Sequence, residues 1–282
     1  MRKLLIALLL VVCLDVSAQM PRCHYTADDS TLVCRLLASG QTDPLWFARQ
    51  FEGRPYVAHT LELYPDDERL VLNTKELDCT TFVDVVVALT LCSQRGERQF
   101  SDFVIQLQRQ RYRGGVCNGY PSRIHYFSDW IDDGTRKGFV REIQQKEAPF
   151  TAVQTLKIDY MTKHPDAYVA LKRHPKFLTP IAAQEDSLTG RRYRYIPTSA
   201  VTNSRAMRAA VHNGDILATV STTPGLDIAH LGFAVWHDDG LYFLDASSIH
   251  KKVVEEPVPL RTYLQQRKKM AGIRVVRIRV KN

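Results

Sequence analysis

The order of hydrophobic and polar residues along the chain first predicts where the main helices lie. Thr80–Cys92 is almost entirely apolar, and a helix with hardly any polar side belongs in the middle of a fold. A short amphipathic helix is predicted to begin at Asp43-Pro44 and to stop at Gly53-Arg54-Pro55, since proline is tolerated early in a helix and glycine and proline end it. A third, amphipathic helix is predicted at Ser101–Arg113, where Ser-Asp supplies the cap.

Strands are predicted where short apolar or alternating runs end at turn residues. Residues 60–72 alternate around Pro65-Asp66-Asp67 and predict a β-hairpin. The last third of the chain is rich in such runs. A helix is predicted at about Leu260–Met270, just before the final strand. The strands predicted there are Ile216–Ser221, Ile228–His237, Leu241–Ala246 and Ile273–Val280.

These elements predict an α+β fold, in which a central buried helix is followed by an antiparallel sheet. Residues 19–40 are expected to form an irregular N-terminal arm. Residues 41–282 are expected to form a single domain, with helices and loops inserted at about 100–200. Residues 114–200 in particular are expected to be helices and loops that frame a cleft, because they contain several turns and no linker.

The first residues predict a signal peptide. Arg2 and Lys3 are followed by the aliphatic run Leu4–Leu14, and Val16-Ser17-Ala18 offers small residues for cleavage after Ala18. The run is too short for a comfortable bilayer span, and no later segment is long and apolar enough for one. The mature protein is therefore expected to be exported, most simply to the periplasm of a Gram-negative bacterium, with secretion as the alternative.

Charge and motif content narrow the function. The formal net charge is +8, but it is dispersed, and no long Lys/Arg block predicts nucleic-acid binding. No His-Glu-x-x-His motif or paired ligand spacing predicts a metal site. The sequence therefore implies no cofactor, no nucleic acid and no protein partner.

The cysteines point to one unpaired thiol. The chain has six cysteines, and loss of Cys13 with the leader leaves an odd number in an oxidising compartment. Cys23 with Cys34, and Cys92 with Cys117, are candidates for disulfides, which would leave Cys79 free. The alternative is that all five are buried thiols, which are uncommon in exported proteins.

Cys79 immediately precedes the buried helix, in Leu-Asp-Cys-Thr-Thr-Phe. The positive end of a helix dipole and the unpaired N–H groups of the first turn favour a thiolate. The same N–H groups can stabilise an oxyanion when sulfur attacks a carbonyl. Cys79 is therefore a candidate nucleophile; the alternative, a small thiol buried at a helix start, is about equally common.

His230 is the candidate base. It lies inside the apolar strand Ile228–His237, where an imidazole is costly without a partner. His230, Gly232 and Ala234 share one face of the strand, so small residues leave room beside the imidazole for a substrate. The alternative is an ordinary hydrogen-bonded core histidine.

Asp245 is the candidate for a third, orienting residue. If Asp238-Asp239 form a two-residue hairpin loop, Gly232 faces Asp245 and the carboxylate lies diagonally from His230 on the same face. A carboxylate there holds the second ring nitrogen, as in a catalytic triad. A three-residue loop would put Asp245 on the opposite face.

Four sequence blocks, in order, resemble the NlpC-type papain-like cell-wall peptidases. They are Leu-Asp-Cys-Thr-Thr-Phe-Val, Arg-Ile-His-Tyr-Phe-Ser-Asp-Trp, Asn-Gly-Asp-Ile, and Asp-Ile-Ala-His-Leu-Gly followed by Ala-Ser-Ser. The second and last are similar to the N-acetylmuramoyl-L-alanine amidase-like branch. The resemblance implies a papain-like core with Cys79 as nucleophile and His230 as base; at Asp245 the branch has a histidine in His-Ala-Ser-Ser.

The same resemblance implies a substrate. The branch cleaves the amide between the lactyl group of muramic acid and L-alanine, in small anhydro-muropeptides rather than intact wall. Peptidoglycan fragments are thus the expected partner, and several polar and aromatic residues near the motifs become candidates to bind them. These candidates are Tyr126, Ser128, Asp129, Trp130, Asp227 and Ser247. For the first four, the alternative is a capped helix start with its aromatic rings in the core.

Three functions therefore compete. The first is a cysteine amidase acting on the muramoyl–L-alanine bond, and the second a γ-D-glutamyl-diaminopimelate endopeptidase with the same triad and a different cleft. The third is a catalytically silent module that binds the cell wall. Because Cys79, His230 and Asp245 are all present, the sequence favours an enzyme.

Overall fold

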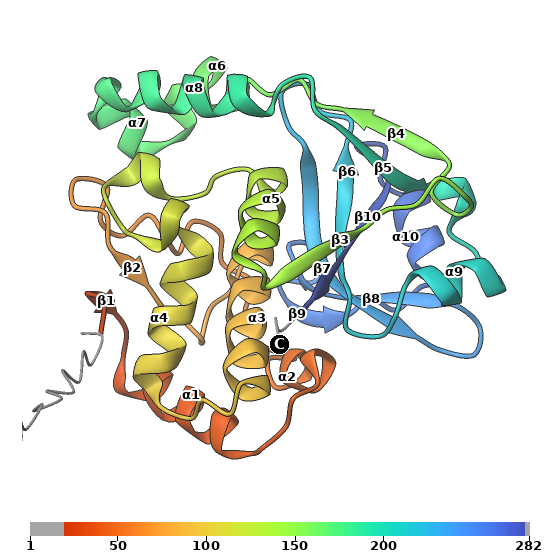
Figure 1. Cartoon of the computed structure of the whole chain (residues 1–282), viewed down its shortest axis with the longest axis horizontal. Helices are drawn as coiled ribbons and strands as arrows, with labels where there is room; N and C mark the ends of the chain where they lie inside the picture. Colours follow the sequence, from red (N-terminus) through yellow and green to blue (C-terminus); the bar gives the residue numbers. More distant parts are fainter. Residues whose placement is uncertain (1–19, 280–282) are drawn as a thin grey trace, which may run out of the picture.

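The structure, a computed structural model, describes residues 20–279. Helices α1 to α5 gather on one side of the molecule and a twisted sheet on the other, with α6, α7 and α8 arching over one end (Figure 1). The predicted signal peptide, residues 1–18, and Val280 lie outside the described residues. Within them, no helix is both long and apolar enough to cross a membrane.

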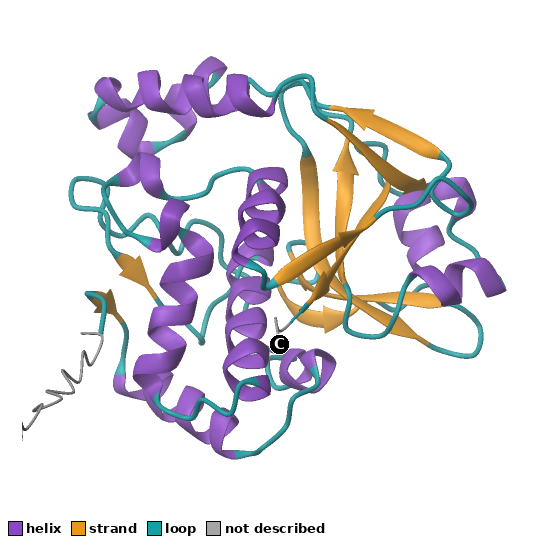
Figure 2. Cartoon of the chain, viewed as in Figure 1, coloured by secondary structure: helices purple, strands orange, loops and turns teal. Residues whose placement is uncertain are grey.

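Most of the long helices lie on one side of the molecule and the strands of the main sheet on the other (Figure 2). The helices are α1 (Ala27–Ala38), α2 (Pro44–Arg49), α3 (Cys79–Gln94), α4 (Phe100–Arg111), α5 (Phe127–Lys137), α6 (Tyr160–Lys163), α7 (Val169–Arg173), α8 (Leu178–Leu188), α9 (Arg205–Ala210) and α10 (Leu260–Gln265). The strands are β1 (Cys23–His24), β2 (Leu70–Val71), β3 (Val140–Ile143), β4 (Ala152–Thr155), β5 (Arg192–Pro197), β6 (Ile216–Ser221), β7 (Ile228–Trp236), β8 (Leu241–Ser247), β9 (Lys252–Glu255) and β10 (Met270–Ile278). The α+β prediction is confirmed.

Helix α3 is the central buried helix that the sequence predicts. Asp78 caps its start, accepting the backbone N–H of Thr81 at 2.8 Å, while the Thr81 hydroxyl accepts the N–H of Asp78. The helix packs against β7, where the ring of Phe82 meets Phe233 edge-on at 5.4 Å. Burial of this apolar helix against the sheet supplies much of the free energy that holds the two halves together.

The main sheet is antiparallel in every pairing, in the order β4-β5-β10-β6-β7-β8-β9, with β3 also paired to β10. The β7–β8 hairpin closes through Asp238-Asp239, and Gly232 faces Asp245, as the two-residue loop predicts. Only glycine fits at 232, because a Cβ there would lie 2.6 Å from the carbonyl oxygen of Leu244.

The N-terminal arm prediction is wrong. Residues 27–38 form helix α1, which begins with a capping box between Thr26 and Asp29 and buries Leu32, Val33 and Leu36 in the same core as α3. Thr-x-x-Asp followed by apolar residues three and four apart is an ordinary helix signal.

Two further element predictions are wrong. Residues 60–72 form turns that end in β2, and β2 pairs in parallel with β1, so there is no hairpin at this place. Residues 114–200 hold not only helices and loops but also β3, β4 and β5, which extend the sheet. These strands are short, and their backbone groups are satisfied only by partners distant in sequence, since β3 and β5 pair with β10 and β4 pairs with β5.

The predicted disulfides Cys23–Cys34 and Cys92–Cys117 are not present. The five cysteines of the described residues are all free: Cys23, Cys34, Cys79, Cys92 and Cys117. Cys34 is exposed on α1, whereas Cys92 is buried in α3. The Cys117 thiol instead lies 3.4 Å from the carbonyl oxygen of Glu68. The prediction of two disulfides is therefore wrong.

Candidate active site

Cys79 is the first residue of α3, as its sequence context predicts. The capping box occupies the N–H of Thr81 and anchors the turn that precedes the cysteine. The N–H groups of Cys79 and Thr80 belong to the first turn, which has no intrahelical acceptors, and they find none among residues 20–279. The helix start thus offers a thiol beside two unused backbone donors.

His230 lies on β7 and faces Cys79. Its side chain is 11% exposed, and its Nε2 is hydrogen-bonded to Oδ2 of Asp245, which is completely buried on β8. The ring of Phe243 supports the imidazole edge-on at 5.8 Å. The register of the hairpin therefore brings the predicted base and the predicted orienting carboxylate into direct contact.

The electrostatics of this group favour a charged imidazole. Burial lowers the pKa of His230, but the charge of Cys79 and the hydrogen bond that His230 donates to Asp245 outweigh it and raise the pKa to about 10. Burial raises the pKa of Asp245, and its hydrogen bond to His230 offsets part of that shift. An imidazolium at this place is the natural counter-ion for a thiolate on Cys79.

A cavity of about 180 Å³ opens beside Cys79 and His230. Its walls come from the start of α3, the segment that leads into α5, and the loop that leads into β7. The lining residues are Cys79, Thr80, Ile124, His125, Tyr126, Phe127, Trp130, Leu226, Asp227, Ile228, Ala229, His230 and Leu231. The cavity is therefore largely apolar and aromatic, and its lining includes both Cys79 and His230.

Three of the predicted substrate-binding residues line this cavity. Tyr126 and Trp130 do so with most of their surface buried, and Trp130 stacks on Phe127 with ring centroids 4.8 Å apart. The third is Asp227, whose carboxylate accepts the backbone N–H of Ser128 at 2.6 Å. Asp227 thus caps the start of α5 and fixes one wall of the cavity.

The other predicted substrate-binding residues lie behind the cavity wall. The Ser128 hydroxyl accepts a hydrogen bond from Arg274, and Asp129 pairs with Arg113 at 2.5 Å. The Ser247 hydroxyl donates to Glu256 at 2.9 Å. For Ser128 and Asp129 the alternative, a helix start with internal polar contacts, describes the structure better.

The structure adds two residues that the sequence did not single out. Tyr56 is half-buried, and burial together with the charges of Cys79, Asp78 and Asp245 raises its pKa to about 12. His125 is the second, and it lines the cavity. No local pattern marks Tyr56, because its strand-like bridge to Leu77 forms only in the folded chain.

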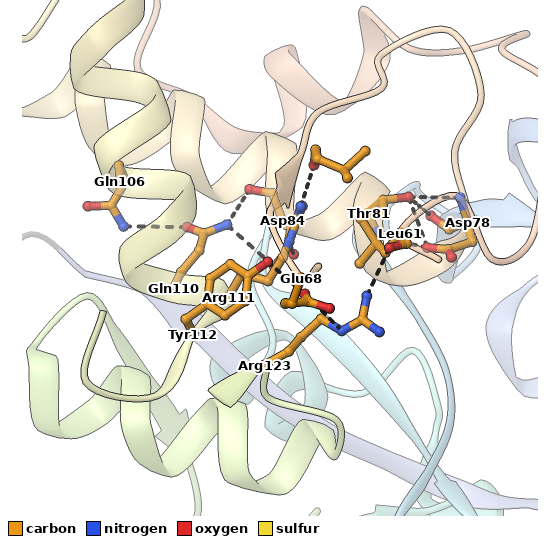
Figure 3. Close-up of polar contacts among 11 residues, drawn as sticks. Leu61, Glu68, Asp78, Thr81, Asp84, Gln106, Gln110, Arg111, Tyr112 and Arg123 are labelled. Atoms are coloured by element: carbon orange, nitrogen blue, oxygen red, sulfur yellow. Dashed lines mark hydrogen bonds and ion pairs between the residues drawn. The ribbon is translucent and has the colours of Figure 1, made fainter. Parts of the chain in front are cut away.

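A buried polar network holds the segment that carries His125 and Tyr126 (Figure 3). Arg123 is buried and pairs with Glu62 and Glu68, and it also donates to the carbonyl oxygen of Leu61 at 3.2 Å. A second pair, Arg111 with Asp84 at 2.9 Å, joins α4 to α3 in the same view. These charges are paired and hydrogen-bonded, as buried charges must be.

No metal site accompanies this group. Within residues 20–279, no three His, Cys, Asp or Glu side chains come close enough to hold an ion together.

Solved structures of bacterial amidases share this architecture. An N-acetylmuramoyl-L-alanine amidase from Bacteroides uniformis is 40% identical, with a TM-score of 0.78 over 86% of this chain and 100% of that one. A Bacteroides fragilis protein provisionally described as a xylanase is also 40% identical, with a TM-score of 0.77 over 83% and 100% of the two chains. A Legionella pneumophila protein at 23% identity shares the fold, with a TM-score of 0.70 over 90% and 95%.

The family follows from the sequence itself. The AmiA-like family, described as N-acetylmuramoyl-L-alanine amidase-like, matches residues 46–273, and the chain belongs to it. No curated protein sequence matches the chain.

Proposed function

We propose that this protein is a cysteine-dependent N-acetylmuramoyl-L-alanine amidase of the NlpC-type, papain-like class. The observation that carries the proposal is His230, which faces Cys79 and is held by Asp245 through Nε2. A nucleophile, a base and a group that orients the base are the three parts that such hydrolysis needs.

The reaction takes two steps. The Cys79 thiolate attacks the lactyl carbonyl carbon, the C–N bond to L-alanine breaks, and the amine leaves with the proton carried by His230. Water then attacks the thioester, gives a proton to His230, and releases the acid and the thiolate. The free N–H groups of Cys79 and Thr80 are placed to stabilise the oxyanion in both steps.

The proposed substrate is a small muropeptide, including fragments with a 1,6-anhydro end. Membership of the N-acetylmuramoyl-L-alanine amidase-like family supports the bond that is cut. The aromatic walls formed by Tyr126, Phe127 and Trp130 support a glycan in the cavity, since sugar faces stack well on rings. The proposed place of action is the periplasm, reached through the signal peptide.

Glycoside hydrolysis, which the Bacteroides fragilis description raises, is a poorer fit. Most glycosidases need two carboxyl groups on either side of the scissile bond. Asp227 is the single carboxylate among the described residues that line the cavity, and it is engaged by the N–H of Ser128. The cavity therefore has the groups for amide cleavage and not for that reaction.

The test compares two substrates: a disaccharide-tripeptide with a 1,6-anhydro end, and the same tripeptide alone. The amidase releases free disaccharide and intact tripeptide from the first and leaves the second almost untouched, because binding energy from the sugar is used at the scissile amide. Mass spectrometry of the products shows which bond is cut. Release of L-alanyl-D-glutamate from the free peptide would identify an endopeptidase, and no hydrolysis of either would identify a silent module.

A further inference from the structure

His125 occupies a distinctive place in the wall of the cavity. It lines the same cavity as Cys79 and His230, but neither step of the proposed reaction uses it. It lies two residues after the buried Arg123, which is held in place by its ion pairs with Glu62 and Glu68. A side chain held this firmly in a binding cavity needs an explanation in terms of what it contacts.

One ring nitrogen of His125 is hydrogen-bonded within the protein. Nε2 lies 3.1 Å from the backbone carbonyl oxygen of Tyr120, and the ring packs on the Tyr120 ring with centroids 4.6 Å apart. A carbonyl oxygen can only accept a hydrogen bond, so Nε2 carries the proton and donates it. The tautomer is therefore fixed by the fold.

The ring is also neutral. Burial, together with the positive charge of Arg123, lowers the pKa of His125 to about 3. Arg123 cannot move away, because Glu62 and Glu68 hold it and its guanidinium lies 4.9 Å above the Tyr120 ring. With Nε2 protonated and the ring uncharged, Nδ1 presents a lone pair and is an acceptor.

That acceptor has nothing to accept from within the protein. Among residues 20–279 no donor reaches Nδ1 of His125. Nor is Nδ1 one of the buried, unpaired side-chain atoms of that part of the chain, so it is accessible, on a side chain that lines the cavity. An oriented acceptor left free in a cavity is the kind of polar group that fixes a ligand's orientation.

We propose that His125 binds the substrate, with Nδ1 accepting a hydrogen bond from an uncharged donor, a hydroxyl or an amide N–H, on the glycan part. The lone pair disfavours a carboxylate at this position. The described lining of the cavity contains no Lys or Arg side chain to attract one either. This inference rests on the proposed function, which places the sugar against the aromatic residues Tyr126, Phe127 and Trp130.

The test uses two replacements that each keep one half of the imidazole. His125→Gln carries its amide to the position of Nε2, so it still donates to Tyr120 but offers no acceptor at the position of Nδ1. We expect the KM for the disaccharide-tripeptide to rise about tenfold, with kcat within about twofold, as for the loss of one neutral hydrogen bond. His125→Asn places its amide at the position of Nδ1 and should keep KM within about threefold of the wild-type value.

A purely structural role predicts the opposite order, in which Gln is harmless and Asn is damaging. That order, or an unchanged KM in His125→Gln, would overturn the inference. The matched control is His164→Gln, because His164 is exposed, outside the cavity, and likewise packed on a tyrosine, with Nδ1 2.9 Å from the Tyr160 carbonyl oxygen. We expect no change in this control.

Equilibrium binding separates this inference from the proposed function. The intact disaccharide-tripeptide is titrated by calorimetry into Cys79→Ala protein with and without His125→Gln. About tenfold weaker binding with His125→Gln supports the inference. It does so even if the wild-type protein does not hydrolyse the fragment, a result that would contradict the proposed function alone. Equal affinities, or no binding at all, would overturn the role of His125 whatever the hydrolysis assay shows.

Discussion

Cys79 is the residue on which the proposed chemistry depends most directly. Replacing it with Ala should abolish hydrolysis of the muropeptide while leaving the circular dichroism spectrum and the melting temperature close to the wild-type values. Cys79→Ser should be nearly as inactive, because a hydroxyl ionises far less readily than a thiol beside the same base. Full activity in the alanine variant would exclude a cysteine mechanism.

Alkylation gives a second view of the same residue. Burial raises the pKa of Cys23, Cys92 and Cys117, so these thiols should react slowly, whereas Cys34 is exposed and needs to be removed. In Cys34→Ser protein, iodoacetamide should label Cys79 first. Peptide mapping after a short reaction identifies the modified residue.

The charge state of His230 leads to a prediction about pH. Its pKa is raised from 6.5 to about 10 in the folded protein. Its charge therefore stabilises the fold fully below about pH 6.5, the ordinary histidine value, and that contribution is lost as the pH rises through about 10. Cys79→Ala removes the largest of the interactions that raise the pKa, so the His230 pKa should fall.

Nitrogen-15 NMR of the histidine rings measures this shift, because the ring nitrogens respond directly to protonation. A His230 pKa that is the same with and without Cys79 would mean that the two side chains do not interact electrostatically. The cysteine would then lack its base.

At the scale of single elements, the start of α3 matters most. The Asp78 carboxylate caps this helix through the N–H of Thr81, and loss of an aspartate cap costs about 1 kcal/mol. Asp78→Ala should lower the free energy of unfolding by about that amount and should also lower kcat several-fold, because the first turn carries Cys79. Urea unfolding and steady-state kinetics measure the two effects.

Asp43→Ala is the matched control for this prediction. Asp43 caps α2 in the same way, accepting the N–H of Leu45 at 2.9 Å, but α2 carries none of the proposed catalytic residues. It should cost a similar free energy of unfolding and leave kcat unchanged. Equal losses of kcat in both variants would show that the effect is one of general stability.

At the scale of the whole molecule, Arg274 joins parts of the chain that are far apart. It is fully buried on β10, pairs with Glu142 of β3 at 2.6 Å, and donates to the Ser128 hydroxyl of α5 at 2.7 Å. Its guanidinium also lies 3.8 Å from the centre of the Tyr193 ring on β5. Arg274 therefore links the sheet to the helix that walls the cavity.

Arg274→Met should destabilise the protein by about 3–5 kcal/mol, because it leaves the buried Glu142 carboxylate without its partner. Adding Glu142→Gln should recover much of that loss, since a buried amide is cheaper than an unpaired charge. Arg49→Met, which removes exposed ion pairs with Glu52 and Glu255, should cost at most about 1 kcal/mol. Denaturant unfolding of the wild-type protein and these three variants tests the difference.

The sequence by itself determined those features that depend on neighbouring residues. The cap at Asp78 and the apolar run behind it are local, so the helix that presents Cys79 was predictable. The two-residue turn at Asp238-Asp239 is local as well, and it sets the register that places Asp245 beside His230. The spacing of apolar residues and the length of the turn determine this helix and this strand register, whatever the rest of the chain does.

Only the tertiary structure decided the rest. The Asp227 carboxylate meets the N–H of Ser128, 99 residues away, and the Tyr120 carbonyl fixes the tautomer of His125 through a contact across a loop. The free cysteines and the strands β3 to β5 likewise depend on which segments become neighbours. Such contacts form because burial and pairing of polar groups are satisfied jointly over the whole molecule, and no local periodicity encodes them.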